Sequence, residues 1–259
     1  MEKYIHRLSF VITFVLVYIA AGYIYLSYKG FVYQEGSFEL VKPANAAVSD
    51  EKNSAAPQSF ATPIDSNIAL NFEAQNVVGS KDAPLTIYEF SSFGCPHCAD
   101  FHLNVLPKLS EQYFDTNKVR LVFIAFPLDR RSMQAAMLEH CLNPFDRPDF
   151  VNLIFSKQRE WALARKAEVP FAAYAQNFGL KEQDFKACLK NDTLAKEIMF
   201  SRQEAIDKLK IEGTPAFLIS DAYKNEIIYG VSSFKDFKQY LDERISLLEQ
   251  AKKTSSDEQ

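Results

Sequence analysis

Only four cysteines occur in the 259 residues, and only two of them form a C-x-x-C pair. A four-thiolate zinc site needs two such pairs, so the sequence excludes this class of metal centre. The chain also lacks an excess of basic residues, since 29 Lys and Arg stand against 33 Asp and Glu and leave a net charge of −4. Because no basic stripe is present, nothing in the composition indicates nucleic-acid binding. No internal repeat is visible either.

Charge is absent from residues 8–28, which are almost wholly apolar or aromatic. A helix needs about 20 such residues to span a bilayer, whereas the apolar region of a cleavable signal peptide has about 7–15. An Ala44-Asn45-Ala46 motif that resembles a cleavage site lies well beyond the apolar run. We therefore predict a single uncleaved transmembrane helix rather than a signal peptide or a buried helix. Lys3 and Arg7 precede it and favour a cytoplasmic N-terminal tip, so residues 1–28 form tip and anchor.

Residues 29–66 are predicted to be a juxtamembrane segment and a flexible linker. From residue 42 to 66 the chain has six alanines, four serines, three prolines and one aromatic residue, Phe60. Such a segment cannot bury a core. The globular domain is therefore predicted at residues 67–250, followed by a polar tail at 251–259.

The C-x-x-C pair, Cys95-Pro96-His97-Cys98, follows the β-favouring run 85–91. Pro96 suits the first turn of a helix. Cys95 is then expected where free backbone N–H groups and the helix dipole favour a thiolate, with Cys98 more deeply buried. One sulfur can attack a disulfide and the other can resolve the mixed disulfide, which predicts redox catalysis rather than a structural bridge. The helix is indicated by apolar residues at helical spacing: Phe101, Val105, Leu106, Leu109 and Tyr113.

A second motif, Gly213-Thr214-Pro215-Ala216-Phe217, lies about 120 positions downstream. The two motifs together resemble the DsbA family of thioredoxin-fold thiol:disulfide oxidoreductases, and the likeness covers roughly residues 77–248. The resemblance implies an α/β thioredoxin-like fold with a helical insertion at about 129–192. It also implies that Thr214 and Pro215, joined by a cis bond, flank the dithiol and pair with the substrate chain. No cofactor and no metal are expected.

Two further side chains are candidates for the catalytic site. His97 lies between the thiols and can donate a hydrogen bond or positive charge to the Cys95 thiolate, although it can also be a merely exposed first-turn residue. For Glu89 the resemblance implies a buried carboxylate that assists proton transfer, against the alternative of an outward-facing strand residue. His102 and His140 have no matching partner in the sequence, so we expect them to be structural or solvated.

Cys141 and Cys188 complete an even cysteine count. In a domain outside the cytoplasm, pairing is expected, and a structural disulfide is favoured over two free buried thiols. Some members of the DsbA family carry a second bridge of this kind and others lack it.

The residue patterns predict four further elements. They are a strand at 119–126 parallel to the first, a helix at 193–210 with Asp192 as N-cap and Gly213 just past its end, a hairpin of strands at 216–220 and 226–230, and a last helix opened by Ser233 and Asp236.

We therefore predict an enzyme held in the inner (cytoplasmic) membrane by residues 8–28, with its catalytic domain in the periplasm. It is expected to introduce disulfides into cysteine-containing substrate proteins through Cys95 and Cys98. The resemblance implies reoxidation by a quinone-linked membrane protein of the DsbB type. The alternatives are a disulfide isomerase or reductase of the same fold and, in a different class, a copper- or zinc-binding module that uses Cys95, Cys98 and a histidine.

Overall fold

A computed structural model of the chain describes residues 31–34, 37–40, 61–64, 76–230 and 233–257. The chain divides into two units, Met1–Pro57 and Gln58–Gln259. In the first unit, β1 (Phe31–Gln34) and β2 (Ser37–Leu40) form an antiparallel hairpin. The predicted anchor at residues 8–28 lies outside the described residues. Within the described ranges, no helix has the length and apolar character needed to cross a membrane.

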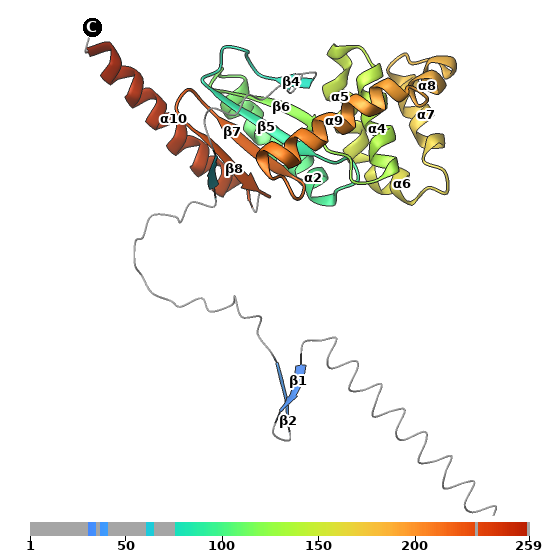
Figure 1. Ribbon diagram of the computed structural model, residues 1–259, viewed down its shortest axis with the longest axis horizontal. Coiled ribbons are helices and arrows are strands. Elements are labelled where there is room, and N and C mark those ends of the chain that lie inside the picture. Colours follow the sequence, from blue (N-terminus) through green and yellow to red (C-terminus); the bar gives the residue numbers. More distant parts are fainter. Residues whose placement is uncertain (1–30, 35–36, 41–60, 65–75, 231–232, 258–259) are drawn as a thin grey trace, which may run out of the picture. The chain divides into compact units, whose positions relative to one another are not determined.

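The second unit is built on a six-stranded sheet with the strand order β3-β8-β7-β5-β6-β4 (Figure 1). β5 and β6 are parallel, as predicted, and the other neighbouring strands are antiparallel. β5 lies in the middle, where Ile87 is opposite both Leu121 of β6 and Ile219 of β7. The strands are β3 (Ala61–Ile64), β4 (Asn76–Val78), β5 (Leu85–Ser91), β6 (Val119–Ala125), β7 (Ala216–Ser220) and β8 (Asn225–Tyr229).

The edge strand β3 lies inside the segment that the sequence assigns to the linker. Ala61 is buried, and it pairs with Ile228 of β8. The sheet therefore begins before residue 67, and the predicted domain boundary is wrong at this point. The strand has only four residues and includes Pro63, which is tolerated because an edge strand leaves one side of its backbone unpaired. Neither feature gives a clear strand signal in the sequence.

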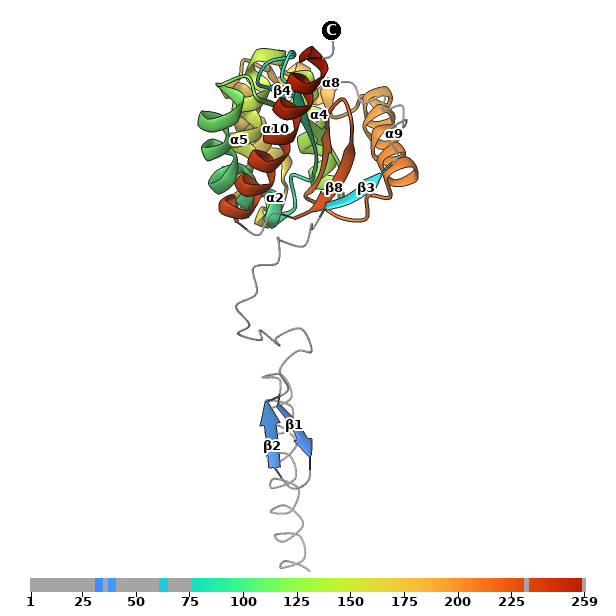
Figure 2. The ribbon, with the colours of Figure 1, turned by 90° about the vertical axis from the view of Figure 1, so that its left-hand side faces the viewer.

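Helices cover both faces of the sheet (Figure 2). Leu85 and Ile87 pack against the helix that begins at Pro96 and against α10 (Phe234–Asp257), whereas Phe90 packs against α9 (Asp192–Leu209) on the other face. The helix from Pro96 contains two π-helical segments, and these keep apolar residues spaced four apart on one side. Its consecutive parts are α2 (Pro96–Asp100), η1 (Phe101–Val105), α3 (Leu106–Leu109) and η2 (Ser110–Phe114).

A helical insertion follows β6, and its apolar residues, which include Phe150, Trp161 and Phe171, belong to a buried cluster that also contains Cys95 and Cys98. The Cys141 and Cys188 sulfurs are 2.10 Å apart and form a disulfide that joins α4 to α8. The insertion lies within the predicted range of about 129–192. It comprises α4 (Arg130–Cys141), η3 (Pro144–Asp146), α5 (Arg147–Ser156), α6 (Gln158–Leu163), α7 (Glu168–Asn177) and α8 (Glu182–Cys188).

The ends of the last two helices differ from the prediction. Asn191, not Asp192, is the N-cap of α9, since its side chain accepts a hydrogen bond from the Leu194 N–H group at 3.1 Å. At the other end the left-handed residue is Lys210, with φ of 57°, and not Gly213. The helix α10 runs to Asp257, so the predicted polar tail is helical over residues 251–257.

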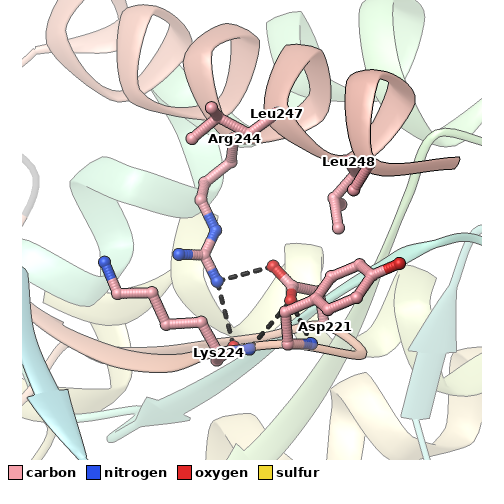
Figure 3. Close-up of a pocket in the computed structure, with 7 residues that line it drawn as sticks. Asp221, Lys224, Arg244, Leu247 and Leu248 are labelled. Carbon is pink, nitrogen blue, oxygen red and sulfur yellow. Dashed lines mark hydrogen bonds and ion pairs between the residues drawn. The ribbon is translucent and has the colours of Figure 1, made fainter. Parts of the chain in front are cut away.

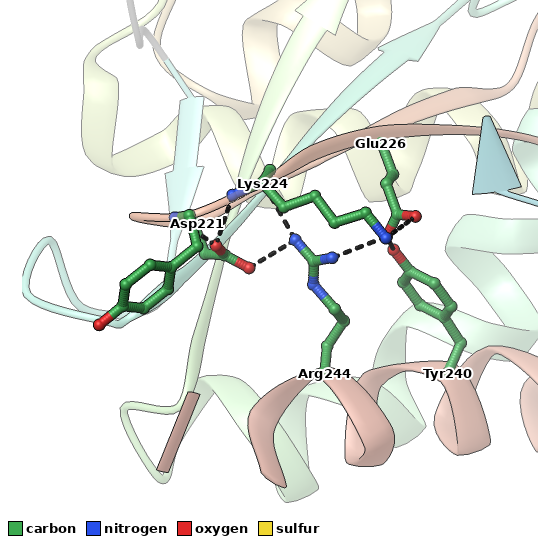
Figure 4. Close-up of polar contacts among 6 residues, drawn as sticks. Asp221, Lys224, Glu226, Tyr240 and Arg244 are labelled. Carbon is green, nitrogen blue, oxygen red and sulfur yellow. Dashed lines mark hydrogen bonds and ion pairs between the residues drawn. The ribbon is translucent and has the colours of Figure 1, made fainter. Parts of the chain in front are cut away.

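Arg244 fixes α10 to the turn between β7 and β8 (Figure 4). Its buried guanidinium donates to Asp221 at 2.5 Å and to Glu226 at 2.8 Å, and the Tyr240 hydroxyl also donates to Glu226. The buried charges are thus paired, as their desolvation requires. A small pocket lies beside this network (Figure 3), lined by Asp221, Tyr223, Lys224, Arg244, Leu247, Leu248 and Ala251.

Candidate active site

Cys95 is the N-cap of α2, where the sequence predicts it. Its backbone is extended, with φ of −81° and ψ of 121°, and Pro96 is the first helical residue. The Cys95 N–H group donates to the Ser92 carbonyl at 3.0 Å, and the Cys95 carbonyl accepts from the Ala99 N–H group at 3.2 Å. The side chain of Cys95 retains slight exposure, at 8%, while that of Cys98 is fully buried.

The surroundings of Cys95 lower the pKa of its thiol to about 5. The largest cause is a hydrogen bond from the Cys98 thiol, which stabilises the Cys95 thiolate. Burial acts in the opposite direction, and the Thr214 side chain and the backbone N–H groups of Cys98 and His97 lower the pKa further. Cys95 is therefore a thiolate at neutral pH, in a position where the helix dipole also favours negative charge.

Cys98 has the opposite character. Burial raises its pKa far above the ordinary range for a thiol, and two further effects act in the same direction: its hydrogen bond to Cys95 and the negative charge of Glu89. Cys98 therefore keeps its proton at neutral pH. Two chemically identical side chains, one helical turn apart, thus hold different protonation states.

Glu89 and His102 form a buried pair beside the dithiol. The His102 Nε2 atom lies 3.0 and 2.9 Å from the two Glu89 carboxylate oxygens, and the imidazole ring stacks on Phe155 at 4.4 Å. Neither side chain is more than 3% exposed. Glu89 is thus buried, as the resemblance implies.

The structure supplies partners for the two histidines that have none in the sequence pattern, and both are structural. His102 is buried rather than solvated and pairs with Glu89, whereas His140 lies 2.7 Å from Glu139 on α4. One sequence signal for His102 was available: it follows Cys98 by four residues and so lies on the same face of its helix.

The Thr214-Pro215 loop lies against the reactive thiol, although 119 positions separate Cys95 from Thr214. Its peptide bond is cis, and the Thr214 carbonyl lies 3.3 Å from the Cys95 sulfur. The Pro215 carbonyl accepts from the Gly230 N–H group at 2.9 Å, which ties the loop to the end of β8. The two sequence motifs therefore meet in one site.

Pro96 and His97 are exposed beside the thiols. The contribution of His97 to the low Cys95 pKa comes from its backbone N–H group. A role for its imidazole stays a prediction. Among the residues that the structure describes, no three His, Cys, Asp or Glu side chains are arranged to hold a metal ion.

The chain is similar to known disulfide oxidoreductases. A family model described as Thioredoxin matches residues 71–243. A Rickettsia felis protein named as a protein-disulfide oxidoreductase is 28% identical over 196 residues, which cover 73% of this chain and 70% of that protein. Wolbachia pipientis alpha-DsbA1 is 31% identical, with a TM-score of 0.62 over 66% of this chain and 90% of the Wolbachia chain. Oxidised BdbD from Bacillus subtilis, at 22% identity and a TM-score of 0.59, shares the fold over 67% of this chain and 94% of its own.

Proposed function

Since this chain belongs to the thioredoxin family and is a protein-disulfide oxidoreductase of the DsbA type, we propose that it acts as an oxidase that introduces disulfides into substrate proteins. The observation that carries the proposal is the contrast between the Cys95 thiolate and the protonated Cys98. Whatever stabilises the Cys95 thiolate stabilises the reduced enzyme, so the disulfide form passes its oxidising equivalents on readily. A pKa near 5, against an ordinary value of about 8.5, favours the reduced form by about 2–3 kcal/mol at pH 7, or about 60 mV.

In the proposed reaction, a substrate thiolate attacks the Cys95 sulfur of the oxidised enzyme. The Cys95–Cys98 bond breaks, a mixed disulfide forms between Cys95 and the substrate, and Cys98 leaves and takes up a proton. A second substrate thiolate then attacks the substrate sulfur of the mixed disulfide and releases the Cys95 thiolate. Two electrons pass from the substrate to the enzyme. The low pKa of Cys95 makes it the better leaving group in this last step.

The neighbouring residues support these steps in different ways. Thr214 and Pro215 lie against the Cys95 sulfur, where we propose that their backbone pairs with the substrate chain. Glu89 lies close enough to act on Cys98 through its charge, and we propose that it moves the Cys98 proton. Pro96 holds the first turn of α2, and the exposed His97 side chain adds to thiolate stabilisation.

The experiment that tests the proposal combines two measurements on the purified chain. A glutathione redox titration gives the potential of the Cys95/Cys98 couple, and incubation of the oxidised enzyme with a reduced test protein gives the number of disulfides transferred. We expect a potential well above that of thioredoxin, about −270 mV, and one disulfide transferred per enzyme molecule. A potential near the thioredoxin value without transfer would favour a reductase instead.

We also propose that residues 8–28 anchor the enzyme in the inner membrane, with the catalytic domain in the periplasm and a quinone-linked membrane protein of the DsbB type as its oxidant. The uncharged length of this segment supports the proposal. The chain should remain with membranes after an alkaline carbonate wash and should begin at Met1 or Glu2. A mature N-terminus near Ala47 would contradict the anchor and leave the redox proposal untouched.

A further inference from the structure

The loop that carries Cys95 is bonded to the helical insertion through its backbone. The side-chain amide of Gln158, the first residue of α6, donates to the Phe93 carbonyl at 2.7 Å and to the Cys95 carbonyl at 2.9 Å. Gln158 is only 9% exposed, and it lies more than 60 positions from both acceptors. Leaving a buried amide or carbonyl without a hydrogen-bond partner costs free energy, so these two bonds hold Gln158 and the loop together.

The residue between these two carbonyls is held by the insertion as well. The Gly94 N–H group donates to the Ser132 hydroxyl at 3.1 Å, and that hydroxyl donates to the Asp129 carboxylate at 2.9 Å. A Cβ atom at Gly94 would lie 2.5 Å from the Ser132 hydroxyl oxygen and 2.7 Å from an Asp129 oxygen, so any larger residue would have to displace this hydrogen-bonded pair. Three consecutive residues of the loop are thus bonded to side chains of α4 and α6.

Gln158 binds the carbonyl of Cys95 itself, the residue that carries the reactive thiol. The Cys95 carbonyl that it binds also accepts the Ala99 N–H group, the bond that closes the first turn of α2. The position of this carbonyl therefore fixes where the Cys95 side chain lies relative to the N–H groups of His97 and Cys98. A single amide nitrogen with two hydrogens can satisfy both carbonyls, whereas a carboxylate has only acceptors and a thioether has no donor.

We propose that Gln158 is a positioning residue through which the helical insertion holds Cys95 at the N-terminus of α2 and keeps its sulfur reactive. The inference rests on the proposed role of Cys95 as the attacked sulfur. The insertion thus acts on the dithiol through the backbone of the Cys95 loop.

The test compares Gln158→Met with Gln134→Met in the full-length chain. Gln134 is a matched control because it is a part-buried glutamine of the same insertion whose amide donates to Glu168 at 2.7 Å and not to the loop. Thiolate absorbance against pH gives the Cys95 pKa, and a glutathione titration gives the redox equilibrium constant. For Gln158→Met we expect the Cys95 pKa to rise by about one unit and the equilibrium to shift by about tenfold toward the disulfide. For Gln134→Met we expect both values to stay at those of the wild type.

Two outcomes separate this inference from the proposed function. A wild-type Cys95 pKa near 8.5 would overturn the proposed function itself. A low wild-type pKa that is unchanged in a folded Gln158→Met variant would overturn the positioning role alone. If Gln158→Met does not fold, Ser132→Ala, which removes the acceptor of the Gly94 N–H group, must raise the Cys95 pKa, and failure to do so counts against the proposal.

Discussion

The two cysteine pairs lie at opposite ends of their helices. Cys95 precedes the first residue of α2, whereas Cys141 and Cys188 are the last residues of α4 and α8. The positive end of a helix dipole favours a thiolate, and the negative end disfavours one. A reactive thiol therefore needs the first location, and a bridge that should resist exchange is better placed at the second.

The pairs also differ in span and asymmetry. Cys95 and Cys98 are three positions apart at the start of one short helix, and Cys95 is slightly exposed. The pair can therefore be oxidised and reduced without rearrangement of the backbone. The Cys141–Cys188 bridge joins residues 47 positions apart and holds α8 against α4. Position within the fold, and not the residue type, therefore separates a catalytic cysteine pair from a structural one.

Substitution of either catalytic cysteine should have the largest effect. Cys95→Ser should abolish thiol exchange because it removes the attacked sulfur. In the reduced Cys98→Ser variant, the Cys95 thiolate should still attack a substrate disulfide and release one substrate thiolate, and the mixed disulfide should accumulate because no Cys98 thiol is left to resolve it. Non-reducing gels of each reduced variant after incubation with a disulfide-containing test protein measure this. Equal trapping by the two variants would show that the roles are wrongly assigned.

The second prediction concerns removal of the structural disulfide. The Cys141→Ala/Cys188→Ala variant should lose about 4 kcal/mol of unfolding free energy, since the bridge closes a long loop in the unfolded chain. It should still exchange thiols at Cys95. Denaturant unfolding of wild type and variant measures the first effect, and the glutathione equilibrium measures the second. A variant that unfolds like the wild type but has a changed redox potential would reverse the roles we give the two pairs.

The third prediction concerns pH and uses that variant as its background, because reduction then affects only Cys95 and Cys98. The folded pKa of Cys95, about 5, lies below the ordinary value of about 8.5. The thiolate therefore stabilises the reduced protein fully above pH 9, by about 2–3 kcal/mol at pH 7, and this contribution is lost as the pH falls to about 5. Unfolding of the reduced protein with and without Cys95→Ser, at pH 7 and pH 5, measures the difference. A gap that is the same at both pH values would contradict a low Cys95 pKa.

Local patterns in the sequence were enough to predict the central part of the site. The strand at 85–91, the helix start at Pro96 and the burial of Cys98 below Cys95 all follow from residues close together in the chain. The location of Thr214 beside Cys95 came from the resemblance, since no local pattern brings residues 119 positions apart together.

The contacts that the sequence did not predict are long-range or weakly patterned. Gln158 reaches the Cys95 loop from the insertion, and a lone glutamine at a helix start carries no signal of its partner. Glu89 and His102 meet because a strand and a helix pack face to face, which periodicity places only approximately. The cap of α9 differed by one residue because Asn191 and Asp192 are both good N-cap residues.

The last prediction has the smallest expected effect and distinguishes the contribution of the helix N-terminus to the Cys95 pKa from that of the His97 side chain. His97→Ala removes an exposed imidazole but keeps the backbone N–H group that lowers the Cys95 pKa. Because interactions of exposed groups are screened by water, we expect the Cys95 pKa to rise by less than about one unit and the couple to become slightly more reducing. Thiolate absorbance and glutathione titration of wild type and variant measure both changes. A rise of several units would mean that the imidazole, rather than the helix N-terminus, distinguishes Cys95 from Cys141 and Cys188. An unchanged potential would remove the His97 side chain from the mechanism and leave the backbone and the Cys98 thiol to hold the thiolate.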